Sequence, residues 1–214
     1  MYLPTKTCAP VRSTQEAAHG AIVEYRATVD RTAMPPSGGT VLKFAGVAPR
    51  VASSAALSGT VIGRTVVGDR TTIGHGAVLR GDVNDISIGD GVHIEPGVVV
   101  HVAKHNPAGN SLATTVGSGS RIGCGAVLHA CTVQENACVG PGAIVLDGVV
   151  VGTGSIVMPG SLVPPFKQIP PGQVWGGLPA RFLGSADPQS LASLLASCED
   201  GSCPAWTRVQ LVRQ

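Results

Sequence analysis

The segment VQENACVGPGAIVLDGVVVGTGSIVMPGSLV, residues 133–163, carries an aliphatic side chain at every sixth position. The repeating residue is always valine, at Val133, Val139, Val145, Val151, Val157 and Val163. An amphipathic helix has a period near 3.6 and a half-buried strand a period of two, so neither explains this pattern. A period of six is typical of a parallel β-helix, in which three hexads form one triangular coil.

The same period covers most of the preceding sequence. It runs through Val61, Val67, Ile73 and Leu79, through Ile88, Ile94 and Val100, and through Val116, Ile122 and Leu128. We therefore predict an all-β fold, a left-handed parallel β-helix of hexapeptide repeats over residues 45–165, with coils about 4.8 Å apart. Residues 1–44 are expected to form an N-terminal arm that packs on a partner. Residues 166–214 are expected to form a connection, a C-terminal α-helix and a tail, since Asp187-Pro188 is typical of a helix start.

Composition excludes several classes of function. A net charge of +2 over 214 residues gives no electrostatic basis for binding nucleic acid. No apolar stretch is long enough to cross a bilayer, and the N-terminus lacks the apolar region of a secretory signal. The six cysteines are scattered along the chain, unlike those of a small secreted disulfide scaffold. Cys198 and Cys203 are spaced wrongly for a zinc knuckle, although they could close a short disulfide loop.

Two histidines fall on one corner of the predicted coils. If the hexads skip the insertion between Val100 and Val116, then His101 and His129 lie one full coil apart in register, with backbones about 4.8 Å from each other. That spacing allows both imidazoles to bind one zinc ion at about 2.0–2.1 Å. The alternative is that both are ordinary surface histidines that form hydrogen bonds.

Cys124 is predicted to lie on a different corner. It precedes His129 by five residues of extended chain, which is roughly 16 Å, so it cannot share a metal with the histidine pair of its own chain. A third ligand is therefore absent, or it comes from a neighbouring chain, for which a threefold trimer is the natural closed arrangement. Cys124 is also readily explained as a small filler residue, and Cys131 and Cys138 are expected to be structural.

Five motifs carry a resemblance to a known family. They are VLRGDVNDISIGDG (78–91), VVHVAKHN (99–106), GAVLHACTV (125–133), GAIVLDGVVV (142–151) and IPPGQVWGGLPARFL (169–183). Through these motifs, residues 45–183 resemble the gamma-class carbonic anhydrases, in particular the branch found as subunits of mitochondrial respiratory complex I.

The resemblance implies a metal site at a subunit interface. In active members, three histidines bind zinc between two subunits of a trimer, two from one subunit and one from its neighbour. His101 and His129 match the two ligands of one subunit, and Cys124 falls on the third. Arg80 and Asp82 match the residues that form salt bridges between subunits.

Other departures from the family pattern surround this site. The glutamine that helps to orient the zinc-bound hydroxide is Glu95, the interface aspartate is Pro96, and the acidic residue after Arg-Gly-Asp is Val83. A thiolate and Glu95 would both add negative charge and make a zinc-bound water less acidic. A trimer of this chain alone is thus expected to be a poor carbonic anhydrase.

Three functions follow as hypotheses. The first is a mainly structural or assembly subunit of mitochondrial complex I, on the matrix side of the inner membrane and attached to the membrane arm. It would form a heterotrimer with other gamma-carbonic-anhydrase-like subunits, one of which could complete a zinc site at His101 and His129. The second is a working zinc-dependent carbonic anhydrase. The third is a hexapeptide-repeat acyltransferase, with His129 as general base.

Overall fold

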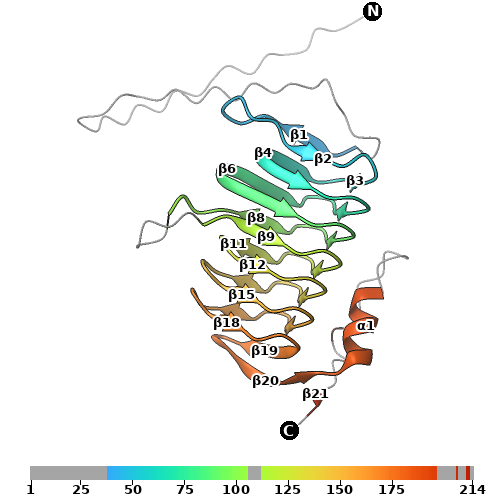
Figure 1. The fold of residues 1–214 in the computed structure, drawn as a ribbon, viewed down its shortest axis with the longest axis vertical. Coiled ribbons are helices and arrows are strands. Elements are labelled where there is room, and N and C mark those ends of the chain that lie inside the picture. The colour runs from blue at the N-terminus through green and yellow to red at the C-terminus, as the bar shows by residue number, and fades with distance from the viewer. Residues whose placement is uncertain (1–37, 106–111, 197–205, 207–210, 213–214) are drawn as a thin grey trace, which may run out of the picture.

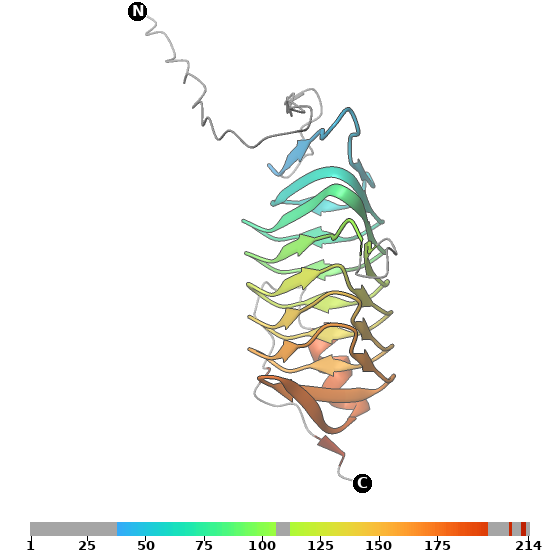
Figure 2. The same ribbon diagram turned by 90° about the vertical axis from the view of Figure 1, so that its left-hand side faces the viewer.

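The computed structural model describes residues 38–105, 112–196, 206 and 211–212, and within them the chain forms a tall β-solenoid (Figure 1). Most of the predicted N-terminal arm, Asn106 and the Cys198/Cys203 tail lie outside the described residues. The strands pair in parallel from coil to coil, in one 12-stranded and one 9-stranded sheet. Figure 2 shows the coils stacked along a single axis. The predicted parallel β-helix with a C-terminal helix is confirmed.

Three faces make up the solenoid. The histidine face contains β1 (Thr40–Leu42), the first halves of β4 (Thr60–Val67) and β6 (Val78–Ile88), β8 (Val99–His101), β11 (Val127–His129), β14 (Ile144–Val145) and β17 (Leu162–Val163). The hydroxyl face contains β2 (Arg50–Val51), the second halves of β4 and β6, β9 (Thr114–Val116), β12 (Thr132–Val133), β15 (Val150–Val151) and β18 (Gln168–Ile169). The helix face contains β3 (Ala56–Leu57), β5 (Thr72–Ile73), β7 (His93–Ile94), β10 (Arg121–Ile122), β13 (Cys138–Val139), β16 (Ile156–Val157) and β19 (Gln173–Gly177).

The core is the stack of residues that repeat every sixth position. Leu79, Val100, Leu128, Val145 and Val163 pair in register down the histidine face, and each is fully buried. The hexad register predicted across the insertion is confirmed, because Leu128 pairs with Val100. Burying these side chains is the main favourable contribution to folding, at about 25 cal/mol per Å² of apolar surface.

The outward-facing rows differ from face to face. On the histidine face the row is aliphatic and partly exposed, with Val78, Val99, Val127, Ile144 and Leu162. On the hydroxyl face it is mostly polar, with Ser87, Thr115, Thr132, Val150 and Gln168. On the helix face its lower part is buried, with Arg121, Cys138, Ile156 and Val174.

The helix α1 (Pro188–Ala196) explains that burial, because it lies along this face (Figure 1). Leu194 packs with Cys138, Ile156 and Trp206 in a second apolar cluster. The helix start matches the prediction, since the Asp187 carboxylate accepts a hydrogen bond from the amide of Ser190 at 2.8 Å. Within the described residues, no helix is both long and apolar enough to cross a membrane.

Parallel pairing extends beyond both ends expected for the solenoid. It begins at Thr40, which pairs with Thr60, and it continues through Ile169 and Trp175 after the expected end at residue 165. Val163, Ile169 and Trp175 keep the six-residue spacing, but two prolines at a corner and an aromatic residue in place of an aliphatic one obscured it. The antiparallel strand β20 (Ala180–Ala186) then pairs with β19, and β21 (Leu211–Val212) pairs with β20.

Candidate functional site

The two candidate metal ligands stand next to each other on one corner of the solenoid. His101 ends β8 and His129 ends β11, and the two residues are direct register partners. Their ring centroids are 5.3 Å apart, with the ring planes inclined by 53°. The stacking predicted from the hexad spacing is therefore what the structure contains.

Each imidazole is held by a carboxylate. His101 Nε2 is 3.0 Å from Asp82 Oδ1, and His129 Nδ1 is 2.5 Å from Asp147 Oδ1. Metal-binding histidines generally donate their other ring N–H to such a carboxylate, which fixes the tautomer and the ring orientation. This leaves Nδ1 of His101 and Nε2 of His129 as the nitrogens suited to a metal.

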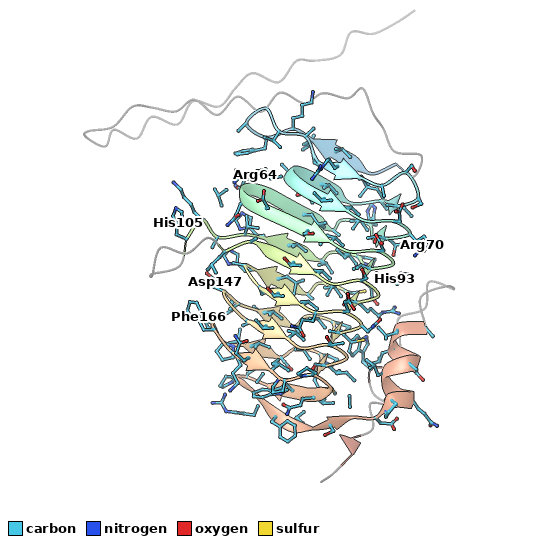
Figure 3. The ribbon with its side chains drawn as sticks, in the orientation of Figure 1. Arg64, Arg70, His93, His105, Asp147 and Phe166 are labelled. Carbon is cyan, nitrogen blue, oxygen red and sulfur yellow. The ribbon has the colours of Figure 1, made fainter. Side chains whose placement is uncertain are left out.

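Asp147 was not identified from the sequence. It follows His129 by 18 residues, the length of one full coil, so the period placed it directly beside that histidine. The signal was present in the same hexad register that paired the two histidines. Figure 3 places Asp147 on the same edge of the solenoid as His105 and Arg64, opposite the edge with His93 and Arg70.

Arg80 and Asp82 contact each other within the chain. Arg80 Nη2 lies 2.6 Å from Asp82 Oδ2, and the Asp82 side chain is only 5% exposed. Burial raises the pKa of Asp82, but hydrogen bonds from the Val83 amide and His101, together with the charge on Arg80, outweigh it and hold that pKa below its usual value. Asp82 is thus a carboxylate that neutralises Arg80 and orients His101, while its contact with another subunit stays a prediction.

The donor set of this corner fits a metal in part. Two imidazoles bound tetrahedrally to zinc at about 2.0–2.1 Å have ring centres roughly 5 Å apart, close to the spacing seen here. Both rings are also partly exposed, at 29% and 34%, so a third ligand could approach them. In the part of the chain that the structure describes, no group of three or more His, Cys, Asp or Glu side chains could hold a metal ion.

Cys124 lies away from the histidine pair, between β10 and β11, and contacts Glu95. Its backbone N–H and its thiol both donate to Glu95 Oε2, at 2.8 and 2.9 Å. The other carboxylate oxygen, Oε1, is 2.6 Å from both Nε and Nη2 of Arg121. The expectation that Glu95 brings an added negative charge needs correction, because Arg121 compensates that charge in a buried ion pair.

Cys131, Cys138 and Val83 have ordinary surroundings. Burial raises the pKa of the Cys131 thiol to about 12, which keeps it protonated and unreactive at neutral pH. Cys138 is buried beneath α1, as expected for a structural residue. Val83 is exposed beside Asp82, and His93 Nδ1 is 2.8 Å from the Thr72 hydroxyl.

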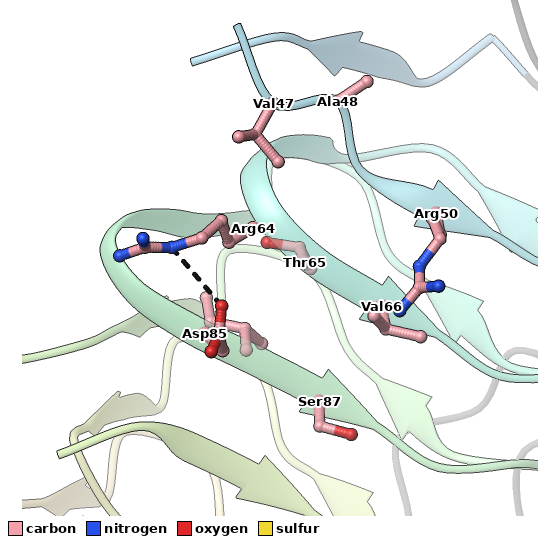
Figure 4. Close-up of a pocket in the computed structure, with 9 residues that line it drawn as sticks. Val47, Ala48, Arg50, Arg64, Thr65, Val66, Asp85 and Ser87 are labelled. Atoms are coloured by element: carbon pink, nitrogen blue, oxygen red, sulfur yellow. Dashed lines mark ion pairs between the residues drawn. The ribbon is translucent and has the colours of Figure 1, made fainter. Parts of the chain in front are cut away.

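A hollow of about 520 Å³ lies nearer the N-terminal end, apart from the histidine pair (Figure 4). Arg50, Val66 and Ser87 line it, and Arg64 forms an exposed ion pair with Asp85 at its edge, with Nε and Oδ1 3.3 Å apart. It is wide and shallow, and it contains no pair of groups arranged for acid–base or metal chemistry.

Comparison with known proteins identifies the family of the chain. No protein-family model matches the chain. A hexapeptide transferase family protein from Anaplasma phagocytophilum has a solved structure with 38% sequence identity and a TM-score of 0.67. The alignment covers 74% of this chain and 91% of that one. The chain belongs to the hexapeptide-repeat family.

Several of its curated relatives are mitochondrial gamma carbonic anhydrases. Gamma carbonic anhydrase 3 of Arabidopsis thaliana is 59% identical over 133 residues, which is 62% of this chain and 50% of the relative. Gamma carbonic anhydrase 2 of the same plant is 44% identical over 143 residues, 67% of this chain and 51% of the relative. The chain thus spans about half the length of these relatives.

Proposed function

We propose that this chain is a gamma-carbonic-anhydrase-like subunit with a mainly structural role in a mitochondrial assembly. The assembly is respiratory complex I, where the chain faces the matrix, sits on the membrane arm and assists assembly. The observation that carries the proposal is the division between two corners. His101 and His129 offer two anchored ligands at one corner, whereas the third-ligand position, Cys124, is bound to Glu95 at another.

A heterotrimer accounts for this asymmetry. The aliphatic row beside the histidine pair includes Val99 and Ile144, which are 39% and 37% exposed. Such a row is the kind of surface that a neighbouring subunit covers, because aliphatic side chains gain free energy when removed from water. A related subunit seated on this face would bring its own third-ligand position close to His101 and His129.

Deletion of the gene tests the structural role directly. We expect loss of assembled complex I on native gels and restoration by the wild-type chain. We also expect restoration by the double variant His101→Ala/His129→Ala, because the role proposed does not depend on metal. Normal complex I in the deletion strain would refute the structural role, and failure of the folded double variant to restore assembly would show that the histidines are required.

The second candidate function is a zinc-dependent carbonic anhydrase that acts at an inter-subunit site. The histidine pair with its two carboxylates favours it. A zinc ion held there would supply a water of lowered pKa for attack on carbon dioxide. In this chain, Asp82 and Asp147 would fix the orientation of the imidazoles.

Elemental analysis of the native assembly tests this candidate. We expect zinc at interfaces that contain His101 and His129 and lost zinc in the His129→Ala variant. Absence of zinc from all such interfaces would exclude the enzyme.

The acyltransferase alternative rests on the similarity to the hexapeptide transferase family protein from Anaplasma phagocytophilum and on the His129–Asp147 pair, which resembles an oriented general base. Hydrolysis of acetyl-coenzyme A by the purified assembly tests that alternative.

A further inference from the structure

A buried ion pair on the helix face leads directly to the third-ligand position. The side chains of Arg121 and Glu95 are only 3% and 9% exposed, although neither lies at an inward position of the solenoid. Arg121 uses Nε and Nη2 on one oxygen of Glu95, while the other oxygen accepts from the amide and the thiol of Cys124. Both oxygens of this carboxylate are therefore committed within the chain.

The same guanidinium holds the C-terminal helix. Arg121 Nη1 donates to the backbone carbonyl of Leu194, at 3.1 Å, in the last turn of α1. Carbonyls of the last turn lack helical partners and carry partial negative charge, so a cation is favourable there. One side chain thus joins the helix, the solenoid and the environment of Cys124.

Such a pair fixes geometry more than it adds stability. Replacing a buried ion pair with apolar residues is often neutral or stabilising, whereas removing one partner leaves an uncompensated buried charge and is strongly destabilising. The Arg121–Glu95 pair must therefore stay together. As long as it does, Glu95 keeps its Oε2 at 2.8–2.9 Å from the amide and sulfur of Cys124.

We propose that Arg121 and Glu95 are positioning residues that hold the Cys124 sulfur within its own chain and close this corner to a metal shared with a neighbour. The proposal rests on the proposed function, because it assumes that the neighbour's histidine pair would meet this corner. The chain then has one half-site that is open, at His101 and His129, and one that is closed. In a heterotrimer the metal would be confined to the interface where another subunit supplies the third ligand.

The proposal predicts what is needed to restore a third metal ligand at position 124. We expect Cys124→His alone to place an imidazole beside Glu95, which would accept its N–H and keep the ring from the neighbour. Restoring the third ligand then requires removal of the ion pair as well. If the identity of residue 124 were the only obstacle, the single substitution would be sufficient.

The first experiment measures access to the thiol in the full-length chain. An organomercurial binds thiols over a wide pH range, so its rate reports access to the sulfur, and peptide mass spectrometry resolves each cysteine. We compare the wild type with Glu95→Gln/Arg121→Met, which removes both charges together. Thr72→Val is the control, because it removes a hydrogen bond to His93 on the same face and leaves the network intact.

We expect Cys124 to react at least about tenfold faster in the double variant and at the wild-type rate in the control. A rate within twofold of wild type in a folded double variant, judged by circular dichroism, overturns the proposal. If the double variant does not fold, Glu95→Leu/Arg121→Met takes its place under the same criterion, because it also removes both charges together, leaves no acceptor for the thiol and fills the site with apolar side chains.

The second experiment measures zinc in the assembled chain. Cys124→His alone is expected to bind no more zinc than wild type, and Cys124→His with Glu95→Gln and Arg121→Met is expected to bind more. Full zinc binding by the single variant overturns the proposal. Faster thiol reaction without zinc in any variant supports the positioning role and counts against the histidine pair as a metal site. Failure of the positioning role can therefore be told apart from failure of the proposed metal site.

Discussion

Two isoleucines at equivalent outward positions provide a matched test of which faces of the solenoid are covered within the chain. Ile156 lies on the helix face and is fully buried beneath α1, whereas Ile144 lies on the histidine face and is 37% exposed. The perturbation is the same for both, truncation to alanine. Because the chemistry is identical, any difference in the free energy of unfolding reports what covers each position.

The expected magnitudes follow from burial. Truncation removes three carbon groups at about 0.8 kcal/mol each, so Ile156→Ala loses about 2.4 kcal/mol of transfer free energy plus a cavity contribution, or about 3 kcal/mol in total. Ile144→Ala removes carbons that are already partly in water and leaves no closed cavity. We expect its effect on the isolated chain to be about 1 kcal/mol.

Urea unfolding of the isolated chain measures both values, with Trp175 and Trp206 as fluorescent probes. Trp206 belongs to the cluster beneath α1, so Ile156→Ala should also change its emission in the folded state. Equal losses for the two variants, within about 0.5 kcal/mol, would refute the assignment of distinct faces. If Ile144→Ala instead weakens association of the assembly, measured by light scattering, the histidine face is the covered interface.

Four further substitutions test the coils, the core and the site. Gly123→Ala brings its Cβ within 2.5 Å of a backbone nitrogen in the next coil and should cost more than about 2 kcal/mol in urea unfolding, whereas Gly142→Ala has open space and only a positive φ, and should cost about 1–2 kcal/mol. The unfolded thiol of Cys131 loses its proton near pH 9 while the folded one keeps it to about pH 12, so stability should fall with rising pH in this window by up to about 1.4 kcal/mol per pH unit. Cys131→Ala should make that slope shallower in unfolding measured at successive pH values. Asp147→Asn should lower the zinc affinity of the assembly about 10–100-fold in competition with a chelator; an unchanged affinity would contradict the role given to this carboxylate.

The period of six made the fold predictable because each coil repeats one environment. Val100 and Leu128 could be paired across an insertion from spacing alone, and the neighbouring histidines followed with them. The ends of the solenoid were less visible, since Trp175 fills the place of an aliphatic residue. A periodic pattern predicts the inward positions of the solenoid well, but it does not predict that an aromatic residue can occupy such a position in the last coil.

The environment of Cys124 could not be predicted in the same way. Glu95 and Arg121 belong to different coils, and neither occupies an inward position of the repeat, so the period gives no reason to pair them. Their contact depends on side-chain direction and on the helix that buries the face, both of which are tertiary properties. The assignment of Cys124 to the third-ligand position therefore stays a prediction, whereas the charge expected around it was misjudged, because Arg121 compensates Glu95.

The three faces of the chain differ from one another in what covers them and in the side chains they present. The lower part of its helix face is covered by α1, its hydroxyl face is mostly polar, and its histidine face keeps an aliphatic row beside two anchored imidazoles. A subunit that contacted its neighbours in the same way through every face would need three equivalent surfaces. Of the three faces of this chain, one carries an exposed aliphatic row. Its asymmetry is consistent with a place among non-identical neighbours, where one corner accepts a ligand from the next subunit and the Cys124 corner is fixed by Glu95 and Arg121.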